Sequence, residues 1–234
     1  MIEMANINPP CQKAYSVRYL ELVPYESALV QQEALRQLRA EGIIPDTVLL
    51  LQHPHVYTVG RFHGEEDIIV PPENILVVRT NRGGSVTYHG PGQLVGYPIL
   101  DLSANGLGVR KYIWKLEEVI IRLLDDFDIE AQRNEDYPGG VWASGRKICS
   151  IGINVSRHVT MHGFALNVNN DLKYYNHIRP CGLRGAAMTS MAEIAGREAS
   201  LATVVHNWVN LFSEVFALRP ENNAALPVEE AALV

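Results

Sequence analysis

The sequence is poor in cysteine, and it lacks the C-x-x-C pairs that are typical of structural zinc sites. Its 234 residues include three cysteines, and no two of them form a C-x-x-C pair. An odd and sparse set of thiols argues against a disulfide framework and fits a reducing compartment. The same spacing argues against a structural zinc site. A chain of this length can bury a core large enough to fold without either kind of cross-link.

Long apolar runs and an excess of positive charge are also missing. The formal net charge is −6, which disfavours nonspecific binding to nucleic acid. No apolar run approaches the roughly 20 residues that cross a membrane, and residues 1–10 lack the basic and apolar segments of a signal peptide. We therefore expect no nucleic-acid and no membrane partner. The expected location is cytoplasmic, or an organelle interior if a targeting segment has been removed.

The spacing of apolar residues predicts a mixed fold. Helices are expected over residues 27–40, 109–127 and 201–218, where apolar side chains recur at the helical period. Strands are expected over residues 16–22, 47–52, 56–59, 75–79, 94–100, 141–144, 147–155 and 159–168. Strands outnumber helices and several are joined by short turns, one of them at Gly145-Arg146. This favours an α+β fold with a mostly antiparallel sheet and flanking helices. Residues 169–183 are expected to form a loop.

Residues 82–93 form the most unusual stretch of the chain. They read R-G-G-S-V-T-Y-H-G-P-G-Q, with four glycines and one proline among twelve residues. Glycine lets the backbone approach a ligand closely, and Pro91 fixes φ in the same turn. A loop of this kind is costly to order, which suggests a binding site rather than a plain connection. It matches neither the dinucleotide-binding G-x-G-x-x-G pattern nor a P-loop.

This stretch resembles the signature of the octanoyltransferase family of lipoate biosynthesis, the lipoyl(octanoyl) transferases. Three further segments fit the same family: residues 144–152 (S-G-R-K-I-C-S-I-G), 161–167 (M-H-G-F-A-L-N) and 178–183 (I-R-P-C-G-L). The resemblance covers about residues 15–218. It implies one catalytic domain over these residues, with the fold of the biotin and lipoate protein ligase catalytic domains. Residues 1–14 and 219–234 are expected to be flexible ends.

Cys181 is the first candidate catalytic residue. It lies in a polar loop between a proline and a glycine, with Arg179 and Arg184 nearby. A free thiol has a pKa of about 8.5, which a nearby ammonium group or a helix N-terminus can lower. From the residues alone, the alternative to a catalytic role is that Cys181 is a small apolar side chain buried in the core. The resemblance implies that Cys181 carries the acyl group as a thioester. Cys149 is the rival thiol, but it stands in an apolar run and is expected to be buried.

Lys147 is the second candidate. It begins an apolar strand just after a tight turn, and on sequence alone a solvated lysine is the alternative. The resemblance implies that Lys147 is the catalytic lysine. Its ammonium group would stabilise the thiolate, and after losing a proton it could accept one from the incoming amine.

The resemblance also implies the residues that line the acyl site. They are Arg82, Gly83, Gly84, Ser85, Val86, Thr87, Tyr88, His89, Ser150, Ile151, Gly152, His162, Gly163, Phe164 and Ala165. Glycine normally weakens a strand, so these glycines would make room for an acyl chain, or alternatively mark a bulge. On the residues alone, both histidines could be structural hydrogen bonders. His53 and His55 flank Pro54 in a turn, and they support no metal site.

The function implied by the resemblance is transfer of an octanoyl group from octanoyl-acyl carrier protein to a lysine of a lipoyl domain. The acceptors would be the lipoyl domains of 2-oxoacid dehydrogenases and the glycine cleavage H protein. A thioester is already activated, so no cofactor and no metal is needed. Acyl carrier proteins are acidic, so an acidic enzyme needs a local basic patch. The candidates by charge are Arg110, Lys111, Lys115, Arg146 and Arg157.

Three alternatives compete with this interpretation. The first is an ATP-dependent lipoate or biotin protein ligase of the same fold, which would need no thiol nucleophile. The second is an amidotransferase that moves octanoyl groups between carrier domains. The third is a nonenzymatic acyl-binding protein, which would have the slot but no turnover.

Overall fold

The computed structural model describes residues 12–61, 67–69, 74–179 and 188–221. Most of the strands form one sheet of eight, in the order β11-β1-β2-β6-β10-β9-β8-β7. In that order their bounds are Leu218–Pro220, Lys13–Leu22, Asp46–Gln52, Gln93–Ile99, Val159–Asn167, Arg146–Ser156, Gly140–Ala143 and Ala131–Arg133. Strand β1 pairs in parallel with β2 and with β11, and the other neighbours are antiparallel. The predicted α+β fold with a mostly antiparallel sheet is confirmed.

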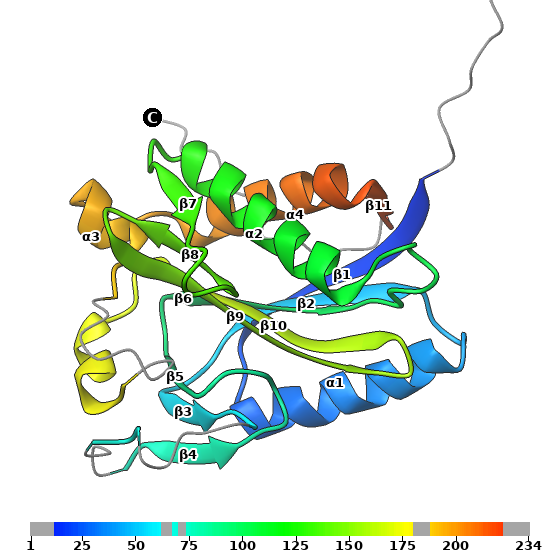
Figure 1. Cartoon of the computed structure of the whole chain (residues 1–234), viewed down its shortest axis with the longest axis horizontal. Coiled ribbons are helices and arrows are strands. Elements are labelled where there is room, and N and C mark those ends of the chain that lie inside the picture. The colour runs from blue at the N-terminus through cyan, green and yellow to red at the C-terminus, as the bar shows by residue number, and fades with distance from the viewer. Residues whose placement is uncertain (1–11, 62–66, 70–73, 180–187, 222–234) are drawn as a thin grey trace, which may run out of the picture.

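Helices cover both faces of the large sheet (Figure 1). Helix α2 (Val109–Asp125) and helix α4 (Leu201–Phe216) lie against each other on one face, and α1 (Tyr25–Ala40) lies on the other. A short helix α3 (Met191–Ala195) and a 3-10 helix η1 (Leu172–His177) complete the described helical segments. The three long helices are those that the apolar period predicts.

The core has two layers because the central strands are buried on both sides. Side chains of a strand alternate between its two faces. In β6, Leu94 accordingly joins the core beneath α2 and α4, while Val95 joins the core beneath α1. The larger layer contains stacked rings, with Trp208 centred 5.1 Å from Phe164 and 4.8 Å from Phe212. Phe164 thus connects this core to the pocket described below.

A second, three-stranded sheet was not expected from the sequence. It has the order β4-β3-β5, with bounds Leu76–Arg79, Val56–Val59 and Val86–His89. Tyr57, Tyr88 and Tyr175 belong to its own apolar core. The expectation that residues 82–93 form a loop is therefore wrong in part, because residues 86–89 are β5. The run V-T-Y-H suits a strand, and it pairs in antiparallel fashion with β3.

The short elements are where the sequence-based prediction failed. Strands β7 and β11 and helix α3 were missed, and η1 lies in the segment expected to be a loop. Residues 13 and 14 pair with residues 218 and 219, so the sheet extends beyond the expected bounds of 15–218 at both ends. The β8–β9 turn is centred on Ser144 and Gly145, which both have positive φ, and Arg146 already belongs to β9. Elements of three to six residues are too short to show a period.

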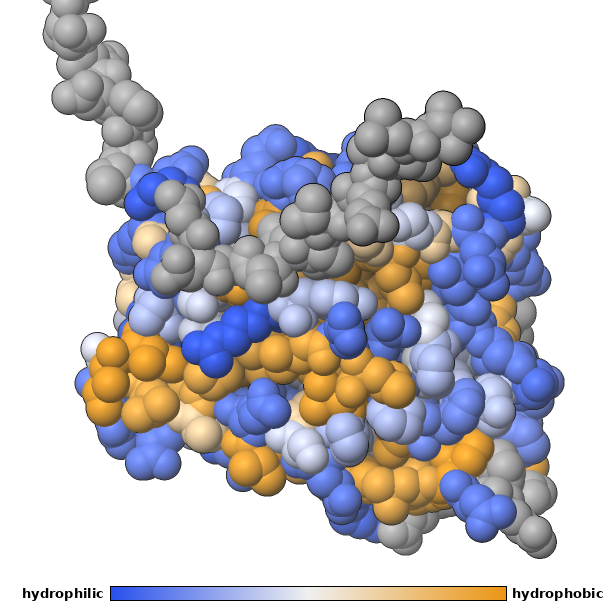
Figure 2. Space-filling view, turned by 180° about the vertical axis from the view of Figure 1, so that it is seen from behind, coloured by the Kyte–Doolittle hydropathy of each residue, from blue (hydrophilic) through white to orange (hydrophobic). Residues whose placement is uncertain are grey.

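Apolar side chains also reach the surface. In the view from behind, they form a band across the middle of the molecule with hydrophilic residues around it (Figure 2). The large apolar side chains with the greatest exposure include Val30 and Ile43, and also Trp114 and Tyr137, which are considered below. Within the described part of the chain, no helix is long and apolar enough to cross a membrane.

Candidate active site

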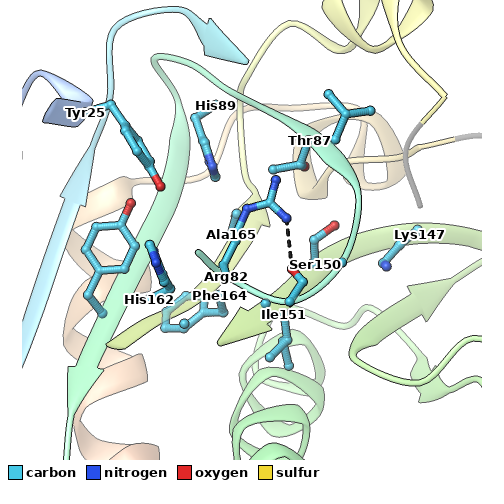
Figure 3. Close-up of a pocket in the computed structure, with 16 residues that line it drawn as sticks. Tyr25, Arg82, Thr87, His89, Lys147, Ser150, Ile151, His162, Phe164 and Ala165 are labelled. Carbon is cyan, nitrogen blue, oxygen red and sulfur yellow. Dashed lines mark hydrogen bonds between the residues drawn. The ribbon is translucent and has the colours of Figure 1, made fainter. Parts of the chain in front are cut away.

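A pocket lies where β9 and β10 of the large sheet meet the glycine-rich segment of the small sheet (Figure 3). Lys147 stands at one end of it and Tyr25 and His162 at the other, with Arg82 between them. The lining comprises Tyr25, Arg82, Gly83, Gly84, Val86, Thr87, His89, Tyr97, Lys147, Ser150, Ile151, Gly152, His162, Gly163, Phe164 and Ala165. The fold thus gathers residues that are far apart in the sequence.

Two of the predicted wall residues lie elsewhere. Tyr88 is buried in the core of the small sheet, and its hydroxyl lies 2.7 Å from His55 Nδ1. Ser85 lines an adjacent groove, and its hydroxyl donates to Asp67. Successive residues of a strand point to opposite sides, so Thr87 and His89 face the pocket while Tyr88 faces away from it. Tyr25 and Tyr97 are lining residues that the sequence did not indicate.

The mid-strand glycines let backbone approach backbone. A Cβ atom on Gly163 would lie 2.2 Å from the carbonyl oxygen of Gly96, and one on Gly152 would lie 2.9 Å from that of Gly83. The amide of Gly83 donates to Ile153 O at 2.9 Å, which fastens the glycine-rich segment to β9. Gly152 and Gly163 face each other in a regular register, so the alternative of a bulge is wrong here.

Arg82 holds the small sheet together beside the pocket. Its guanidinium group donates to Thr58 O at 2.6 Å, to Thr58 Oγ1 at 2.8 Å and to Gly83 O at 3.0 Å. The side chain is buried, so its aliphatic part contributes to the pocket wall. Its charge disfavours a second cation nearby, which affects the neighbouring histidines.

The histidines around the pocket are held in their neutral form. Burial lowers the pKa of His53 to about 4 and that of His162 to about 3, the latter aided by the charges of Arg82 and Arg36. Burial also places the pKa of His89 well below its ordinary value, and His53 and Arg82 add to this effect. His53 lies 2.7 Å from the Tyr97 hydroxyl and His89 lies 2.8 Å from Gln93 Oε1. These imidazoles therefore add no charge to the pocket near pH 7.

This burial predicts an acid-sensitive stability. The folded protein keeps His53 neutral down to about pH 4, whereas the unfolded chain protonates it near pH 6.5. The contribution of His53 to the free energy of unfolding is therefore present above about pH 6.5 and is lost as the pH falls toward 4. For His53, the free energy of unfolding should drop by about 2 kcal/mol between pH 6.5 and 5. Urea unfolding of wild type and His53→Gln at both pH values measures this difference. His206→Gln, an exposed histidine on α4, is the control and should leave the difference unchanged.

Lys147 is buried, so the alternative of a solvated lysine is wrong. It is 3% exposed and lines the pocket from β9. The register between β8 and β9 shifts next to it, since Val141 faces Cys149 while Trp142 faces Lys147. Such a bulge re-aims a side chain. Gly140 provides the space, because a Cβ atom there would lie 2.4 Å from Lys147 Cε.

Cys181 lies outside the described residues, but its flanking chain is anchored. Before it, the amide of Arg179 donates to Asp67 O at 2.7 Å. After it, Met188 forms a parallel bridge with Lys147, and the amide of Thr189 donates to Lys147 O at 3.0 Å. The chain therefore returns from this segment directly beside Lys147.

Cys149 is buried, as the sequence suggested. It is fully enclosed, and this burial raises the pKa of its thiol far above the ordinary value. Only a thiolate is a strong nucleophile, so Cys149 is unsuited to catalysis.

Comparison with known proteins decides the family. Residues 24–213 match the model described as lipoyl protein ligase A/B catalytic domain. A protein of Caldicellulosiruptor saccharolyticus named octanoyltransferase is 46% identical over 210 residues, which cover 87% of this chain and 89% of that protein. Another octanoyltransferase, from Gloeobacter violaceus, is 51% identical over 163 residues, covering 69% and 73%. The chain belongs to the octanoyltransferase family. It is therefore an acyltransferase of protein lipoylation, as its motifs suggested.

Solved structures place this octanoyltransferase family member in the expected fold. A structure described as lipoate-protein ligase A bound with ATP superposes with a TM-score of 0.70 at 16% identity, covering 92% of this chain and 90% of the other. Biotin protein ligase from Aquifex aeolicus gives a TM-score of 0.52 at 14% identity, covering 86% and 68%. At such identities the likeness shows the fold alone, and it confirms the predicted fold of the lipoate and biotin protein ligase catalytic domains.

The five basic residues that were expected to bind the acidic carrier protein differ in their contacts and in their exposure in this octanoyltransferase family member. Arg146 pairs with Glu193 at 2.5 Å, and Lys115 donates to Val215 O while its ammonium group lies over the Phe216 ring. Arg157 lines a hollow beside α1. Arg110 and Lys111 remain exposed on the first turn of α2. Of the five candidates, Arg110 and Lys111 are adjacent and exposed, and Arg157 is exposed elsewhere on the surface.

Within the described ranges, no group of three or more His, Cys, Asp or Glu side chains could hold a metal ion.

Proposed function

We propose that this protein transfers an octanoyl group from octanoyl-acyl carrier protein to a lysine of a lipoyl domain, through a thioester on Cys181. The acceptors would be lipoyl domains of 2-oxoacid dehydrogenases and the glycine cleavage H protein. One observation carries the proposal beyond family membership. A buried lysine, Lys147, lies at the end of the pocket and pairs with the chain that follows Cys181.

The pocket suits the hydrocarbon part of the substrate. Val86, Ile151, Phe164 and Ala165 supply apolar surface, and the adjoining histidines are uncharged. The seven carbons beyond the carbonyl contribute on the order of 5 kcal/mol when buried, at about 0.8 kcal/mol for each methylene. With the acyl tail in the pocket, the carbonyl carbon would be left at the end where Lys147 stands.

The chain is long enough to bring the thiol of Cys181 to that carbonyl. Cys181 precedes Met188 by seven residues, which span at most about 25 Å. Met188 itself is bridged to Lys147. Residue 181 therefore has ample reach to the pocket end at which Lys147 lies.

The first half-reaction forms the acyl-enzyme. The Cys181 thiolate attacks the thioester carbon of the donor, and a tetrahedral oxyanion forms. The bond to the carrier sulfur then breaks, and the departing thiolate takes a proton from the Lys147 ammonium. The products are octanoyl-Cys181 and the free carrier thiol, so atoms and charge balance.

The second half-reaction transfers the acyl group to the acceptor. The amine of the acceptor lysine attacks the octanoyl-Cys181 carbonyl, and neutral Lys147 accepts a proton from the nitrogen. The carbon–sulfur bond breaks, which gives an amide on the acceptor and restores the thiolate beside an ammonium group. A thioester is activated relative to an amide, so the reaction needs no ATP.

The other predicted site residues have two proposed roles. Those that line the pocket would contact the acyl chain. Ser85 and Tyr88 would hold the glycine-rich segment in place through Asp67 and His55. We keep a single catalytic domain over residues 15–218 as a proposal. We also propose a cytoplasmic location, which the small and odd number of cysteines favours.

The test is intact-protein mass spectrometry after brief mixing with octanoyl-acyl carrier protein. The enzyme should gain one octanoyl group without ATP, and a lipoyl domain added next should discharge it and gain that mass. An ATP-dependent ligase would instead release pyrophosphate from ATP when given free octanoate and a lipoyl domain. An amidotransferase would accept an octanoylated lipoyl domain as sole donor, and a binding protein would show no turnover. Any of these three results contradicts the proposal.

A further inference from the structure

A second groove meets the pocket at Lys147. It has a volume of about 880 Å³ and shares Gly83, Gly84, Lys147, Ile151 and Gly152 with the acyl pocket. The rest of its lining comes from one face of α2, from residues 136–139, and from Ser85 and Ile153. Its volume is within the range of small-molecule sites. A substrate that spans both cavities would therefore pass Lys147.

An aromatic platform stands in this groove. Trp114 on α2 is 49% exposed, which is unusual for so large an apolar side chain. Its ring is nevertheless held, because the Arg133 guanidinium lies 4.4 Å from the ring centre and donates to Trp114 O at 3.0 Å. Arg133 is in turn fixed by Glu117 at 3.2 Å and by Glu118 at 2.7 Å. One side of the indole is thus covered by an anchored cation, and the ring remains half exposed in the groove.

The wall formed by residues 136–139 is fixed as well. Glu117 is buried, and its Oε1 accepts from the amides of Gly139 and Gly140 at 3.2 and 3.3 Å. The segment that carries Tyr137 and Pro138 is therefore tied to α2 through the Glu117 side chain. A groove held in this way is formed before any ligand arrives, which lowers the entropy cost of binding.

The groove carries a cation at the start of α2. Arg110 lines it, is exposed, and has no ion-pair partner among the residues that the structure describes. Lys111 is exposed beside it. A ligand whose outer end is anionic would find its complement here.

We propose that this groove binds the phosphopantetheine arm of the acyl carrier protein. The inference rests on the proposed function, since it concerns the thiol side of the same thioester. With the acyl tail in the pocket and the carbonyl at Lys147, the thiol side must continue into the cavity on the other side of Lys147. Trp114 would pack against the arm, and Arg110 would meet the phosphate at its outer end. A lysine side chain of an acceptor is far too small to fill this volume.

The test compares two forms of the carrier protein, with and without the arm, and needs no turnover. Isothermal titration should show that the free-thiol holo-carrier binds wild type about tenfold more tightly than the apo-carrier does. Trp114→Ala should remove this difference, and Arg110→Ala should reduce it about threefold. Val30→Ala and Arg197→Ala, at exposed positions outside the groove, should leave it unchanged. Because Arg110 is a surface residue, its variant remains informative if Trp114→Ala fails to fold.

Acylation rates give a second measurement. Transfer from octanoyl-carrier protein should be about tenfold slower in Trp114→Ala, whereas transfer from S-octanoyl-N-acetylcysteamine, which has only the end of the arm, should change less than twofold. Equal binding of holo- and apo-carrier to wild type, or a preference that persists in both groove variants, would overturn the groove assignment. An enzyme that prefers the holo-carrier but takes no octanoyl group would contradict the proposed function instead.

Discussion

Octanoyl transfer by Cys181→Ala is expected to fall by at least about 10⁴-fold, with no acyl-enzyme formed. Removing the nucleophile of a covalent mechanism leaves only the contribution of substrate binding and positioning. The acceptor amine would then have to attack the carrier thioester directly. Without the acyl-enzyme, the carrier protein and the lipoyl domain would have to bind at the same time. The rate of amide formation on a lipoyl domain, measured with saturating donor, gives the effect on kcat.

Cys149→Ala is the matched control for this experiment. Cys149 is the buried thiol of β9, two residues from Lys147, and its raised pKa keeps it protonated. We expect the variant to form the acyl-enzyme and to keep its rate within about threefold. The idea of Cys181 as nucleophile would be refuted by an adduct that persists in Cys181→Ala and disappears in Cys149→Ala.

Lys147→Met should lower kcat by about 10² to 10⁴-fold, the range found for loss of a general acid or base. Methionine has a similar length and no charge, so it fits the space left by Gly140 without leaving a buried cation. The structure places the ammonium group in a buried position, where its electrostatic effect on a neighbouring thiolate is stronger than in water. Steady-state transfer from octanoyl-carrier protein measures the loss.

A second readout separates this role from a purely structural one. The rate of Cys181 alkylation by iodoacetamide reports the thiolate fraction, and its midpoint should move to higher pH in Lys147→Met. Lys173→Met removes an exposed lysine, 69% accessible, and should alter neither measurement. An unchanged alkylation midpoint together with near-normal transfer would show that Lys147 is not part of the chemistry.

The sequence predicted those helices and strands in which apolar residues recur at a regular spacing. Helix α2 buries Tyr112, Leu116, Ile120 and Leu123 at helical spacing, so its pattern is visible without a structure. Strand β11 has three residues, and it is fixed by its pairing with β1 rather than by any local pattern. The same holds for β5, whose strand conformation depends on β3 and whose glycine-rich surroundings suggested a loop. Pairing between distant segments has no counterpart in local periodicity.

In the site, too, local sequence patterns predicted some features, while others depend on contacts between distant segments. The motifs predicted most of the pocket lining, because residues 82–89, 150–152 and 162–165 carry a recognisable order of residue types. Burial of Lys147 could not be derived from its own neighbours, since the space for it comes from Gly140 on the adjacent strand. Tyr97 likewise reaches the pocket only through the pairing of β6 with β10. Gly140 at the start of a strand was a signal that sequence reasoning could have used, because a mid-sheet glycine often marks a close approach.

The pairing of β1 with β11 has a consequence for the synthesis of the protein. Strand β1 leaves the ribosome about 200 residues before its neighbour β11 is made. Helix α4, which supplies Trp208 and Phe212 to the core, also comes late. Until then the nascent chain has an open sheet edge and an uncovered apolar face, both of which favour aggregation. Folding of this domain therefore cannot finish before β11 has emerged from the ribosome.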